Sequence, residues 1–559
     1  MKKYNLFINS LALLLCLGIV GCNNKTSEPE PFNPEIESRF VVGDDYEEHS
    51  RTYDDDDYIY NESMWYVNNL DKVPLPDPQI YYENGLYYIT GTSDRSNGAC
   101  IDFYVTSDFV NYELYDAVYS PSLYKGWEAN MPQIYAPELY CFDGVYYLYY
   151  SAMAKDGVRY NSVVKASTPL GPYEPIVTST IDGLNYPIFQ YGNHSVLDAS
   201  IFVDDDGKMY MYYAVSGDQY QYIVGVEMKS PYEADWSTYV DLVKPGYLSS
   251  SNPAKVMLWE MYKYYTIAEA PYMIKSNGKY YLTYSVNGCW NKYYSVCYAV
   301  SDSPLGDFVK PYKKNQAWTN LLLGYSGTGV DTSKVYNQWK GYASGTGHHC
   351  FFNIGDQTMI GYHAHQNRDW NSETGYTARY FAIDYLHFDK DGVPFCNGPT
   401  YSLQPLPEAI SGYRNIAEGA KVRSENVTND IAINDNYVVD TYNLEQEDGK
   451  EVVLGNGNSY IELTFDKEYI IGGIAIYNSA YYAKAIYDVS YVDFKNGNAI
   501  KDLEFLSEKF INDETEFVFP NSAFTVEFYT EFKSNKVVIC FDLPEGGQIN
   551  EIKVLGKEA

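Results

Sequence analysis

A short turn motif recurs five times along this 559-residue chain. The copies place Asn-Gly, Asp-Gly or, in the last one, Ile-Gly-Asp between apolar runs, and they begin at Asn84, Asp143, Asp206, Asn277 and Ile354. Asn-Gly and Asp-Gly favour β-hairpins because both central residues of the turn adopt positive φ. Hairpins repeated at intervals of about 60 to 80 residues predict an all-β body of irregular four-stranded blades around one axis.

Three acids lie close to this predicted axis. Asp77, Asp198 and Glu269 are eight or nine residues upstream of the turn glycine in the first, third and fourth repeats. The inner strands of such a ring begin near the axis, so we expect these side chains to meet. Acids at the start of buried, aromatic-rich strands are costly to desolvate, which indicates a function. In the alternative interpretation, Asp77 and Asp198 only cap turns at the blade entrances.

Such a group of carboxyls suits the hydrolysis of a glycosidic bond. That reaction needs a protonated acid for the leaving oxygen and a carboxylate that activates water or attacks the sugar. The composition agrees with a neutral carbohydrate substrate. A formal net charge of -34 and a pI near 4.5 argue against nucleic acid and anionic lipid heads as partners. Of the 63 tyrosines, we expect most to pack the blades and some to face sugar rings.

The N-terminus has the pattern of an export signal. Two lysines precede an apolar core from Leu6 to Val20, which is too short for an ordinary membrane span. The segment 17–22, Leu-Gly-Ile-Val-Gly-Cys, resembles the end of a bacterial lipoprotein signal, in which cleavage precedes a cysteine that becomes lipidated. We therefore expect a signal peptide over 1–21, lipidation of Cys22, and a linker and propeller lead-in over 22–71. This resemblance implies a cell-envelope protein that meets the membrane only through its lipid; a plain secretory signal is the alternative.

The repeat pattern ends near residue 404, so we expect the propeller over 72–404 and a second domain over 405–559. Segments 460–465 and 474–477 alternate like strands and predict a β-sandwich. The opening motif at 415–422 and the closing motif at 549–554 resemble discoidin-like jelly-roll domains. This resemblance leaves open whether the domain binds carbohydrate or only packs on the propeller.

The ordered motifs of the repeat region resemble glycoside hydrolase family 43, whose members are five-bladed propellers. Asp77-Pro78 matches the Asp-Pro of the first blade. Asp198 opens the third-blade motif, with Ala in place of Pro, and Glu269-Ala-Pro matches the fourth-blade Glu-Gly-Pro, with Ala in place of Gly. The resemblance implies that Asp77 is the general base, Glu269 the general acid, and Asp198 the residue that tunes the pKa of the acid and orients it.

Two weaker motifs extend the resemblance. Ala-Pro-Glu138 resembles a second-blade segment, and Gly345-Thr-Gly-His348 resembles the fifth-blade Gly-x-Gly-His. They imply that Glu138 and His348 contact substrate and that His348 lies on the axis, near a calcium or sodium ion held through water. No cofactor is required. A zinc site among His348, His349, His363 and His365 lacks a carboxylate or cysteine at ligand spacing.

One cation and three tryptophans complete the candidate set. Arg379 either holds Asp77, contacts substrate, or forms a surface ion pair. Trp127, Trp290 and Trp370 follow predicted strands and either stack on sugar or pack the blades. Of these, Trp290 is the candidate for the substrate site.

These patterns predict an inverting glycoside hydrolase that removes terminal sugars from plant-type polysaccharide or oligosaccharide. The family resemblance favours an α-L-arabinofuranosidase, with β-D-xylosidase and exo-galactanase as alternatives. Inversion requires the carboxyls of Asp77 and Glu269 to flank a water at a separation of about 6.5 to 9.5 Å. A surface lipoprotein that binds glycan without hydrolysing it is the rival class.

Overall fold

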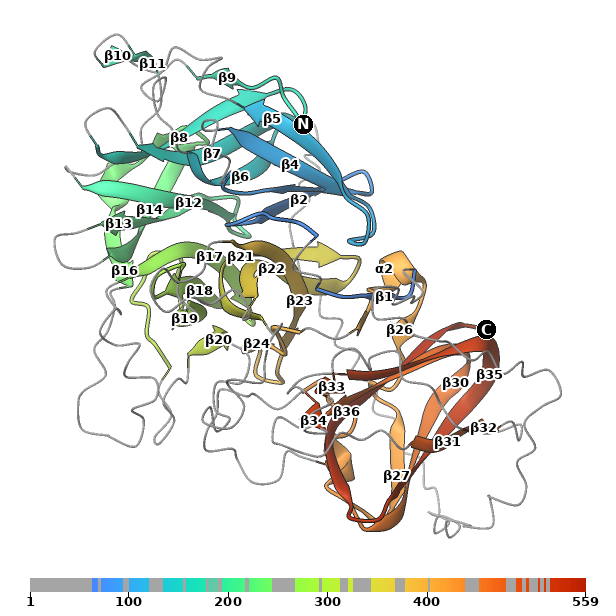
Figure 1. Cartoon of the computed structure of the whole chain (residues 1–559). Coiled ribbons are helices and arrows are strands. Elements are labelled where there is room, and N and C mark those ends of the chain that lie inside the picture. The colour runs from blue at the N-terminus through green and yellow to red at the C-terminus, as the bar shows by residue number, and fades with distance from the viewer. Residues whose placement is uncertain are drawn as a thin grey trace.

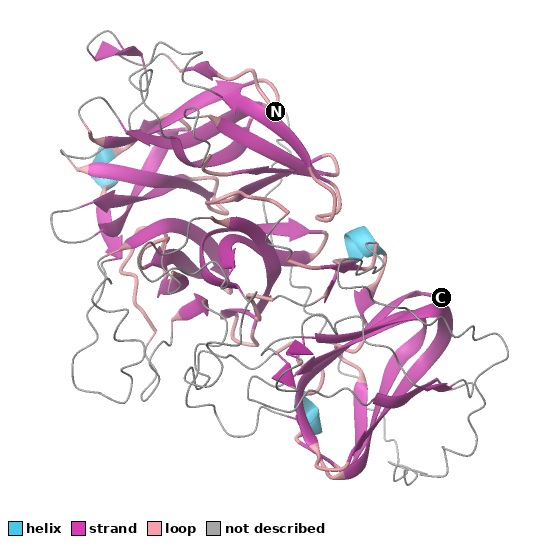
Figure 2. Cartoon of the chain, in the orientation of Figure 1, coloured by secondary structure: helices cyan, strands magenta, loops and turns pink. Residues whose placement is uncertain are grey.

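Almost all regular structure in this protein is β-strand (Figures 1 and 2). The computed structural model describes residues 63–68, 72–93, 100–119, 134–153, 157–176, 180–181, 184–185, 189, 194–216, 221–243, 267–290, 294–311, 320–324, 343–366, 378–400, 403–437, 452–478, 489–494, 499–501, 511–512, 517–518 and 523–559. The helical elements among them are short: α2 (Glu408–Ser411) and the 3-10 turns η3 (Trp236–Thr238) and η7 (Asp430–Ala432). The prediction of an all-β chain is confirmed.

Five antiparallel sheets follow one another along the chain and form the five blades of a propeller. Blade 1 consists of β2 (Gln79–Glu83), β3 (Leu86–Thr90), β4 (Ile101–Thr106) and β5 (Glu113–Tyr119). Blade 2 consists of β6 (Ile134–Phe142), β7 (Val145–Met153), β8 (Arg159–Ala166) and β9 (Glu174–Pro175). Blade 3 consists of β12 (Ser195–Val203), β13 (Met209–Ser216), β14 (Gln221–Ser230), β15 (Glu233–Ala234) and β16 (Val240–Val243).

The last two blades complete the ring. Blade 4 consists of β17 (Ala268–Ser276), β18 (Lys279–Val286), β19 (Ser295–Ser301) and β20 (Leu321–Leu323). Blade 5 consists of β21 (Ala343–Ile354), β22 (Gln357–Gln366), β23 (Tyr380–Phe388) and β24 (Pro394–Cys396). The first strands contact one another in the order β2, β6, β12, β17, β21 and back to β2, so they surround one axis. A separate two-stranded sheet pairs β10 (Thr180–Ile181) with β11 (Leu184–Asn185).

The predicted hairpin turns join the first and second strands of the blades. In three of the five, both central residues have positive φ, as the Asn-Gly and Asp-Gly motifs predict: the pairs beginning at Asn84, Asp143 and Asn277. In the other two, only the glycine does, Gly207 and Gly355. Tyrosine packs between the blades, with Tyr149, Tyr213 and Tyr284 fully buried. The expectation that tyrosine builds the blade cores is therefore confirmed.

The C-terminal strands form a nine-stranded sheet. Its members are β26 (Arg414–Asn415), β27 (Lys421–Glu425), β28 (Val427–Thr428), β29 (Val452–Leu454), β30 (Gly457–Asn478), β31 (Val489–Phe494), β32 (Ala499–Lys501), β35 (Ala523–Leu543) and β36 (Gly547–Glu558). A small hairpin of β33 (Ile511–Asn512) and β34 (Phe517–Val518) lies apart from it. The register of β30 against β35 shifts after Thr464, and apolar residues from both halves of β30 share one core. The sheet therefore curls around its own core like a β-sandwich, as Figure 1 shows.

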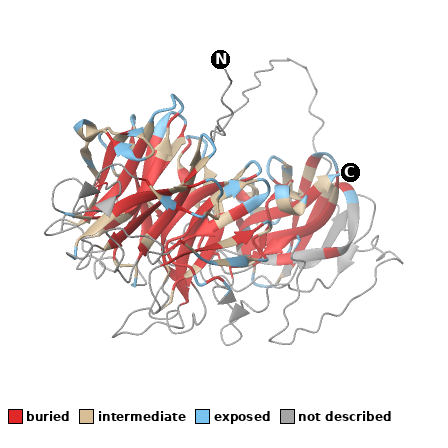
Figure 3. Ribbon diagram, turned by 90° about the horizontal axis from the view of Figure 1, so that it is seen from above, coloured by how far each residue is buried: buried red, intermediate tan, exposed pale blue. Residues whose placement is uncertain are grey.

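Propeller and C-terminal sheet meet at a buried junction. Strand β1 (Trp65–Tyr66) pairs with β25 (Gln404–Pro405), so the segment before blade 1 is tied to the segment after blade 5. Fully buried Trp65 packs with Leu403, Tyr477 and Leu555, which come from both units. The Tyr477 hydroxyl donates a hydrogen bond to Oε1 of Gln404 at 2.6 Å. Buried residues run through the strands of both units (Figure 3).

Candidate active site

Each blade carries one strained residue at the start of its inner strand. Asp77, Ala136, Asp198, Ala270 and His348 have φ values of +54°, +43°, +59°, +51° and +45°. Positive φ is uncommon for residues other than glycine and costs free energy. Where these residues lie inside a strand, the strand register shifts beside them, which marks a β-bulge. The bulges turn successive residues toward the axis, and this builds the site.

A ring of backbone amides holds these bulges. In four blades, the amide of the strained residue donates to a side chain of the preceding blade. That side chain lies on the second strand of its blade or just after it. The acceptors Thr92, Ser151, Ser285 and His363 serve the amides of Ala136, Asp198, His348 and Asp77 at 2.8, 2.9, 2.8 and 3.1 Å. Because His363 of blade 5 serves Asp77 of blade 1, this contact closes the ring.

The fourth blade is the exception. Its amide, from Ala270, donates instead to Oδ2 of Asp198 at 3.0 Å. In blades 2 and 4, the acceptors Ser151 and Ser285 each pair across the strands with the residue just before the bulge. In blade 3 the residue before the bulge is Leu197, and its partner is Ala214. Alanine offers no acceptor, so the amide turns to Asp198. Glu269 precedes this bulge by one residue, whereas Asp77 and Asp198 occupy bulge positions themselves.

Asp77 lies among hydrogen-bond donors. Nη1 of Arg379 donates to its Oδ1 at 2.8 Å, and Nδ1 of His348 lies 3.3 Å from the same atom. The Thr92 hydroxyl donates to Oδ2 at 2.5 Å. Burial of Asp77 favours its neutral form, but Arg379 and then His348 outweigh burial and lower its pKa well below the usual value. The Asp77 side chain is therefore a carboxylate at neutral pH, as a general base must be.

Glu269 has the opposite bias. Burial raises its pKa to about 7, a hydrogen bond from Tyr294 opposes that shift, and the charge of Asp77 adds to it. The Tyr294 hydroxyl donates to Oε1 of Glu269 at 2.8 Å. This contact depends on Gly347, because a Cβ there would lie 2.2 Å from a ring carbon of Tyr294. A carboxyl with a pKa near 7 suits a general acid.

Asp198 is protonated more readily than an ordinary aspartate. Burial is the largest cause, and the charges of Glu269 and Asp77 also raise its pKa, while the amide of Ala270 lowers it. Two buried carboxyls beside each other do not ionise together. Asp198 and Glu269 therefore hold a proton between them at neutral pH. The charge of Asp77 raises the pKa of Glu269. The repulsion between Asp198 and Glu269 raises the pKa of Asp198.

Glu138 lies near these acids but not in direct contact with them. Its carboxylate accepts a hydrogen bond from the Tyr140 hydroxyl. Burial raises its pKa to about 8, although Tyr140 and Ser200 oppose the shift. Its charge contributes to the raised pKa of Asp198, which places it within electrostatic reach. Its predicted contact with substrate stays a prediction.

Arg379 and Trp290 stand together beside Asp77. The guanidinium of Arg379 lies 4.6 Å from the ring centroid of Trp290, and Arg379 is buried. The alternative of a surface ion pair is therefore wrong, and the alternative that Arg379 holds Asp77 is confirmed. Trp290 is 42% exposed, and its ring also lies against His365 of blade 5, with centroids 6.3 Å apart. Trp127 and Trp370 lie outside the described residues, as do the predicted signal peptide and Cys22.

Among the described residues, the histidines form no metal cluster. His348 belongs to no group of three His, Cys, Asp or Glu ligand atoms within 4.8 Å of one another among the described residues. Burial lowers the pKa of His363 to about 3, so it is neutral and its Nδ1 accepts the Asp77 amide. Nδ1 of His348 faces Asp77. An ion near His348 would have to bind through water, and it stays a prediction.

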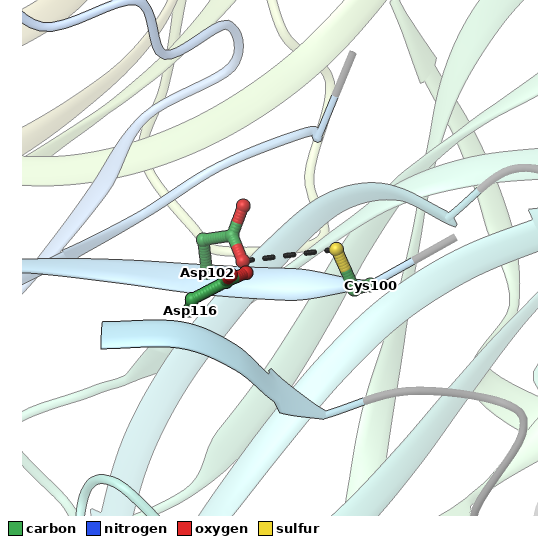
Figure 4. A group of neighbouring side chains, drawn as sticks. All are labelled: Cys100, Asp102 and Asp116. Atoms are coloured by element: carbon green, nitrogen blue, oxygen red, sulfur yellow. Dashed lines mark hydrogen bonds between the residues drawn. The ribbon is translucent and has the colours of Figure 1, made fainter. Parts of the chain in front are cut away.

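One other set of ligand atoms meets that distance in the described part of the chain. Cys100 and Asp102 on or next to β4 and Asp116 on β5 lie together in blade 1 (Figure 4). Oδ1 of Asp102 accepts the amide of Ala117 at 2.7 Å, and the thiol of Cys100 donates to the same atom. Ala117 has a φ of +50°. The Asp102 carboxylate thus supports a β-bulge with positive φ in the edge strand β5.

Two neighbours of the acids escaped the sequence analysis, and a third was considered there only as a zinc ligand. Thr92 and Tyr294 contact the acids directly but belong to no motif that the sequence analysis identified, and His363, named in the histidine set, contacts Asp77. Tyr294 and His363 stack with ring centroids 5.4 Å apart and an interplanar angle of 7°. The pairing of the first two strands of each blade could have indicated Thr92 and His363. Both lie opposite the residue before the bulge in their own blade, and a side chain there faces the bulge of the next blade. Nothing in the sequence distinguishes Tyr294 from the other tyrosines.

Comparison with known protein families gives one match over the propeller. The model described as glycosyl hydrolases family 43 matches residues 67–394. This range reaches the first residue of β24 in blade 5 and includes every acid described above.

Several characterised relatives are similar to part of this chain. The chain is 28% identical over 255 residues to a β-D-galactofuranosidase of Aspergillus niger, with 44% of this chain and 57% of that protein covered. It is 31% identical over 184 residues to a β-xylosidase of Xylanibacter ruminicola, with 30% and 52% covered. The chain thus spans little more than half the length of these two relatives. A xylosidase/arabinosidase of Humicola insolens is 29% identical over 277 residues, with 42% and 77% covered.

Among solved structures, a thermostable family-43 glycoside hydrolase is 25% identical, with a TM-score of 0.48, 61% of this chain and 99% of that chain covered.

Proposed function

This chain belongs to glycosyl hydrolases family 43, and on that premise we propose that it is an inverting glycoside hydrolase that removes terminal sugars from plant-type polysaccharide or oligosaccharide. The observation that carries the proposal is the different setting of two acids. Asp77 accepts hydrogen bonds from Arg379 and Thr92 and has a lowered pKa, whereas Glu269 accepts one from Tyr294 and burial raises its pKa to about 7. Glycoside hydrolysis with inversion needs one carboxylate and one carboxylic acid at the same pH.

The roles follow from these biases. Asp77 takes the proton of a water that attacks the anomeric carbon. Glu269 gives its proton to the glycosidic oxygen as the bond to that oxygen breaks. Asp198 fixes the amide of Ala270 and so the backbone next to Glu269. We propose no cofactor for these steps; a calcium or sodium ion near His348 would act on site geometry, and its removal by chelator would test that.

The preferred substrate is an α-L-arabinofuranosyl group, with β-D-xylosides and galactan-type chains as alternatives. The relatives named a galactofuranosidase, a xylosidase and a xylosidase/arabinosidase support a small furanose or pentose sugar. The exposed Trp290 beside Arg379 supplies a flat face for a sugar ring. We propose it as a substrate contact, together with Glu138, His348 and Arg379.

The decisive experiment measures turnover on aryl α-L-arabinofuranosides, β-D-xylosides and galactosides, followed by proton NMR of the first product. We expect hydrolysis of the arabinofuranoside with inverted anomeric configuration. Retained configuration would remove Asp77 from the base role. Saturable binding of these sugars without turnover of any substrate would favour the glycan-binding lipoprotein.

We also propose that lipid on Cys22 anchors the enzyme to the cell envelope. No helix in the described residues is both long and apolar enough to cross a bilayer. The Cys22→Ser change should release the protein from the membrane fraction with unchanged specific activity. A variant that stays in the membrane fraction would contradict the anchor. The C-terminal sheet is proposed as a discoidin-like domain, and its binding to arabinan can be tested with a glycan pull-down.

A further inference from the structure

Thr92 links the general base to the neighbouring blade. It follows β3 in blade 1 and is 4% exposed. Its amide donates to the carbonyl of Pro76 at 2.9 Å, immediately before Asp77. Its hydroxyl accepts the amide of Ala136 from blade 2 at 2.8 Å and donates to Oδ2 of Asp77 at 2.5 Å. The side chain therefore joins two bulges and one carboxylate.

The direction of this chain of hydrogen bonds is fixed. A hydroxyl has one proton, and an amide can only donate. Because Ala136 fills an acceptor position of the Thr92 oxygen, the hydroxyl proton is left to point at Asp77. A donor of this kind favours the charged form of the acid. Hydrogen bonds to ionised groups are also stronger than those between neutral groups.

The two oxygens of Asp77 have different surroundings. Oδ1 lies against Arg379 at 2.8 Å and His348 at 3.3 Å. His363 gives it no proton, because its Nδ1 already accepts the amide of Asp77. Oδ2 has Thr92 as its partner among the described residues. A carboxylate oxygen can accept more than one hydrogen bond, so Oδ2 is the atom left to receive a proton from water.

The other hydroxyls of the ring do not do this. Ser151 accepts the amide of Asp198 in the same way, but its proton goes to Oδ1 of Asn161 at 2.8 Å. Of the ring hydroxyls Thr92, Ser151 and Ser285, Thr92 is the one that contacts a reacting carboxylate in the described part of the chain. The same ring position therefore joins a backbone amide to the Asn161 side chain in blade 2, and joins a backbone amide to the general base in blade 1.

We infer that Thr92 is a positioning residue for the general base: it holds Oδ2 of Asp77 toward the water and keeps that carboxylate ionised through a contact anchored on the amide of Ala136. This inference rests on the proposed hydrolase function. It assigns the proton-accepting oxygen, which neither the family match nor the motifs specify.

The test compares Thr92→Val with Thr92→Ser in the full chain. Valine keeps the shape and loses the hydroxyl, whereas serine keeps both hydrogen bonds. We expect Thr92→Val to lower kcat on an aryl arabinofuranoside about tenfold to a hundredfold with little change in KM, and serine to restore most of it. The acidic limb of kcat/KM, measured from about pH 3 upward, should move up by about one pH unit in the valine variant alone.

The matched control is Ser151→Ala, which removes the equivalent amide acceptor without touching Asp77. It should lower the Tm, as Thr92→Val does, but leave the acidic limb in place. An unmoved limb in Thr92→Val, with wild-type turnover intact, would overturn the role of Thr92. Absence of turnover in the wild-type protein on every glycoside would instead reject the proposed hydrolase function.

Discussion

Asp77 and Asp198 occupy the same position in two different blades, and their acidities diverge. Both follow the same bulge geometry, with φ of +54° and +59°, and both are buried, at 7% and 5% exposure. The pKa of Asp77 is nevertheless lowered and that of Asp198 is raised. Burial pushes both in one direction, so their neighbours decide the outcome.

The neighbours come from different blades. Asp77 faces Arg379 of blade 5, which supplies a positive charge, and Nδ1 of His348 in the same blade lies 3.3 Å from its Oδ1. Asp198 faces Glu269 of blade 4, which supplies a competing carboxyl. One side of the site is thus built to hold a negative charge and the other to hold a proton. This asymmetry converts one repeated position into a base and a partner of the acid.

The largest expected effect is that of Asp77→Asn. It removes the carboxylate that Arg379 holds in its ionised form. We expect kcat/KM to fall by about 10⁴-fold on a natural oligosaccharide and on an aryl glycoside alike, because water must be activated whatever group departs. Steady-state kinetics on both substrates check this. A loss confined to the natural substrate would contradict the base role.

Glu269→Gln removes the general acid. We expect a loss of about 10³-fold on the natural substrate and only about tenfold on an aryl glycoside with a good leaving group, since such a group needs little protonation. In the wild type, activity on the natural substrate should fall as pH rises through about 7, where Glu269 loses its proton. This alkaline limb should be absent from the variant. Equal losses on both substrates, with chemistry rate-limiting, would remove Glu269 from the acid role.

Arg379→Met should make the acidities of Asp77 and Asp198 more alike, because it removes the positive charge beside Asp77. Without the guanidinium, burial dominates and the pKa of Asp77 should rise, which moves the acidic limb of kcat/KM to higher pH. At a pH below the new limb, activity should be about ten- to a hundredfold lower. Arg379→Lys is the matched control, because it keeps the charge and should move the limb less. An acidic limb that stays in place in the methionine variant would contradict this account of Asp77.

The smallest effect concerns the strain on the acid side. Ala270 has a φ of +51° where the resembled motif has glycine, so Ala270→Gly should stabilise the fold by about 0.5–1 kcal/mol. Ala268→Gly, in the same strand without positive φ, should instead destabilise it by about 1 kcal/mol. Thermal unfolding of both variants gives the comparison. Equal destabilisation by the two glycines would show that the bulge carries no strain.

Much of the fold was within reach of the sequence because its signals are local. The Asn-Gly and Asp-Gly turns specify hairpins through their own backbone preferences, and five hairpins specify five blades. The three acids were identified because each lies at a fixed spacing from such a turn. Arg379 was a candidate with three open roles, since no local pattern says which carboxyl a distant cation meets.

What the sequence determined by itself is therefore the set of elements and the acids that they carry. The tertiary structure alone decided which acid is ionised, because that depends on charges and donors brought together from other blades. Arg379 is 302 residues from Asp77 in sequence and 2.8 Å away in space. Thr92 and Ala214 occupy equivalent positions in blades 1 and 3. The Thr92 hydroxyl donates to the general base, whereas Ala214 has no hydroxyl, so the amide of Ala270 donates to Asp198 instead. Turn chemistry acts between adjacent residues, whereas pKa follows the whole surrounding field.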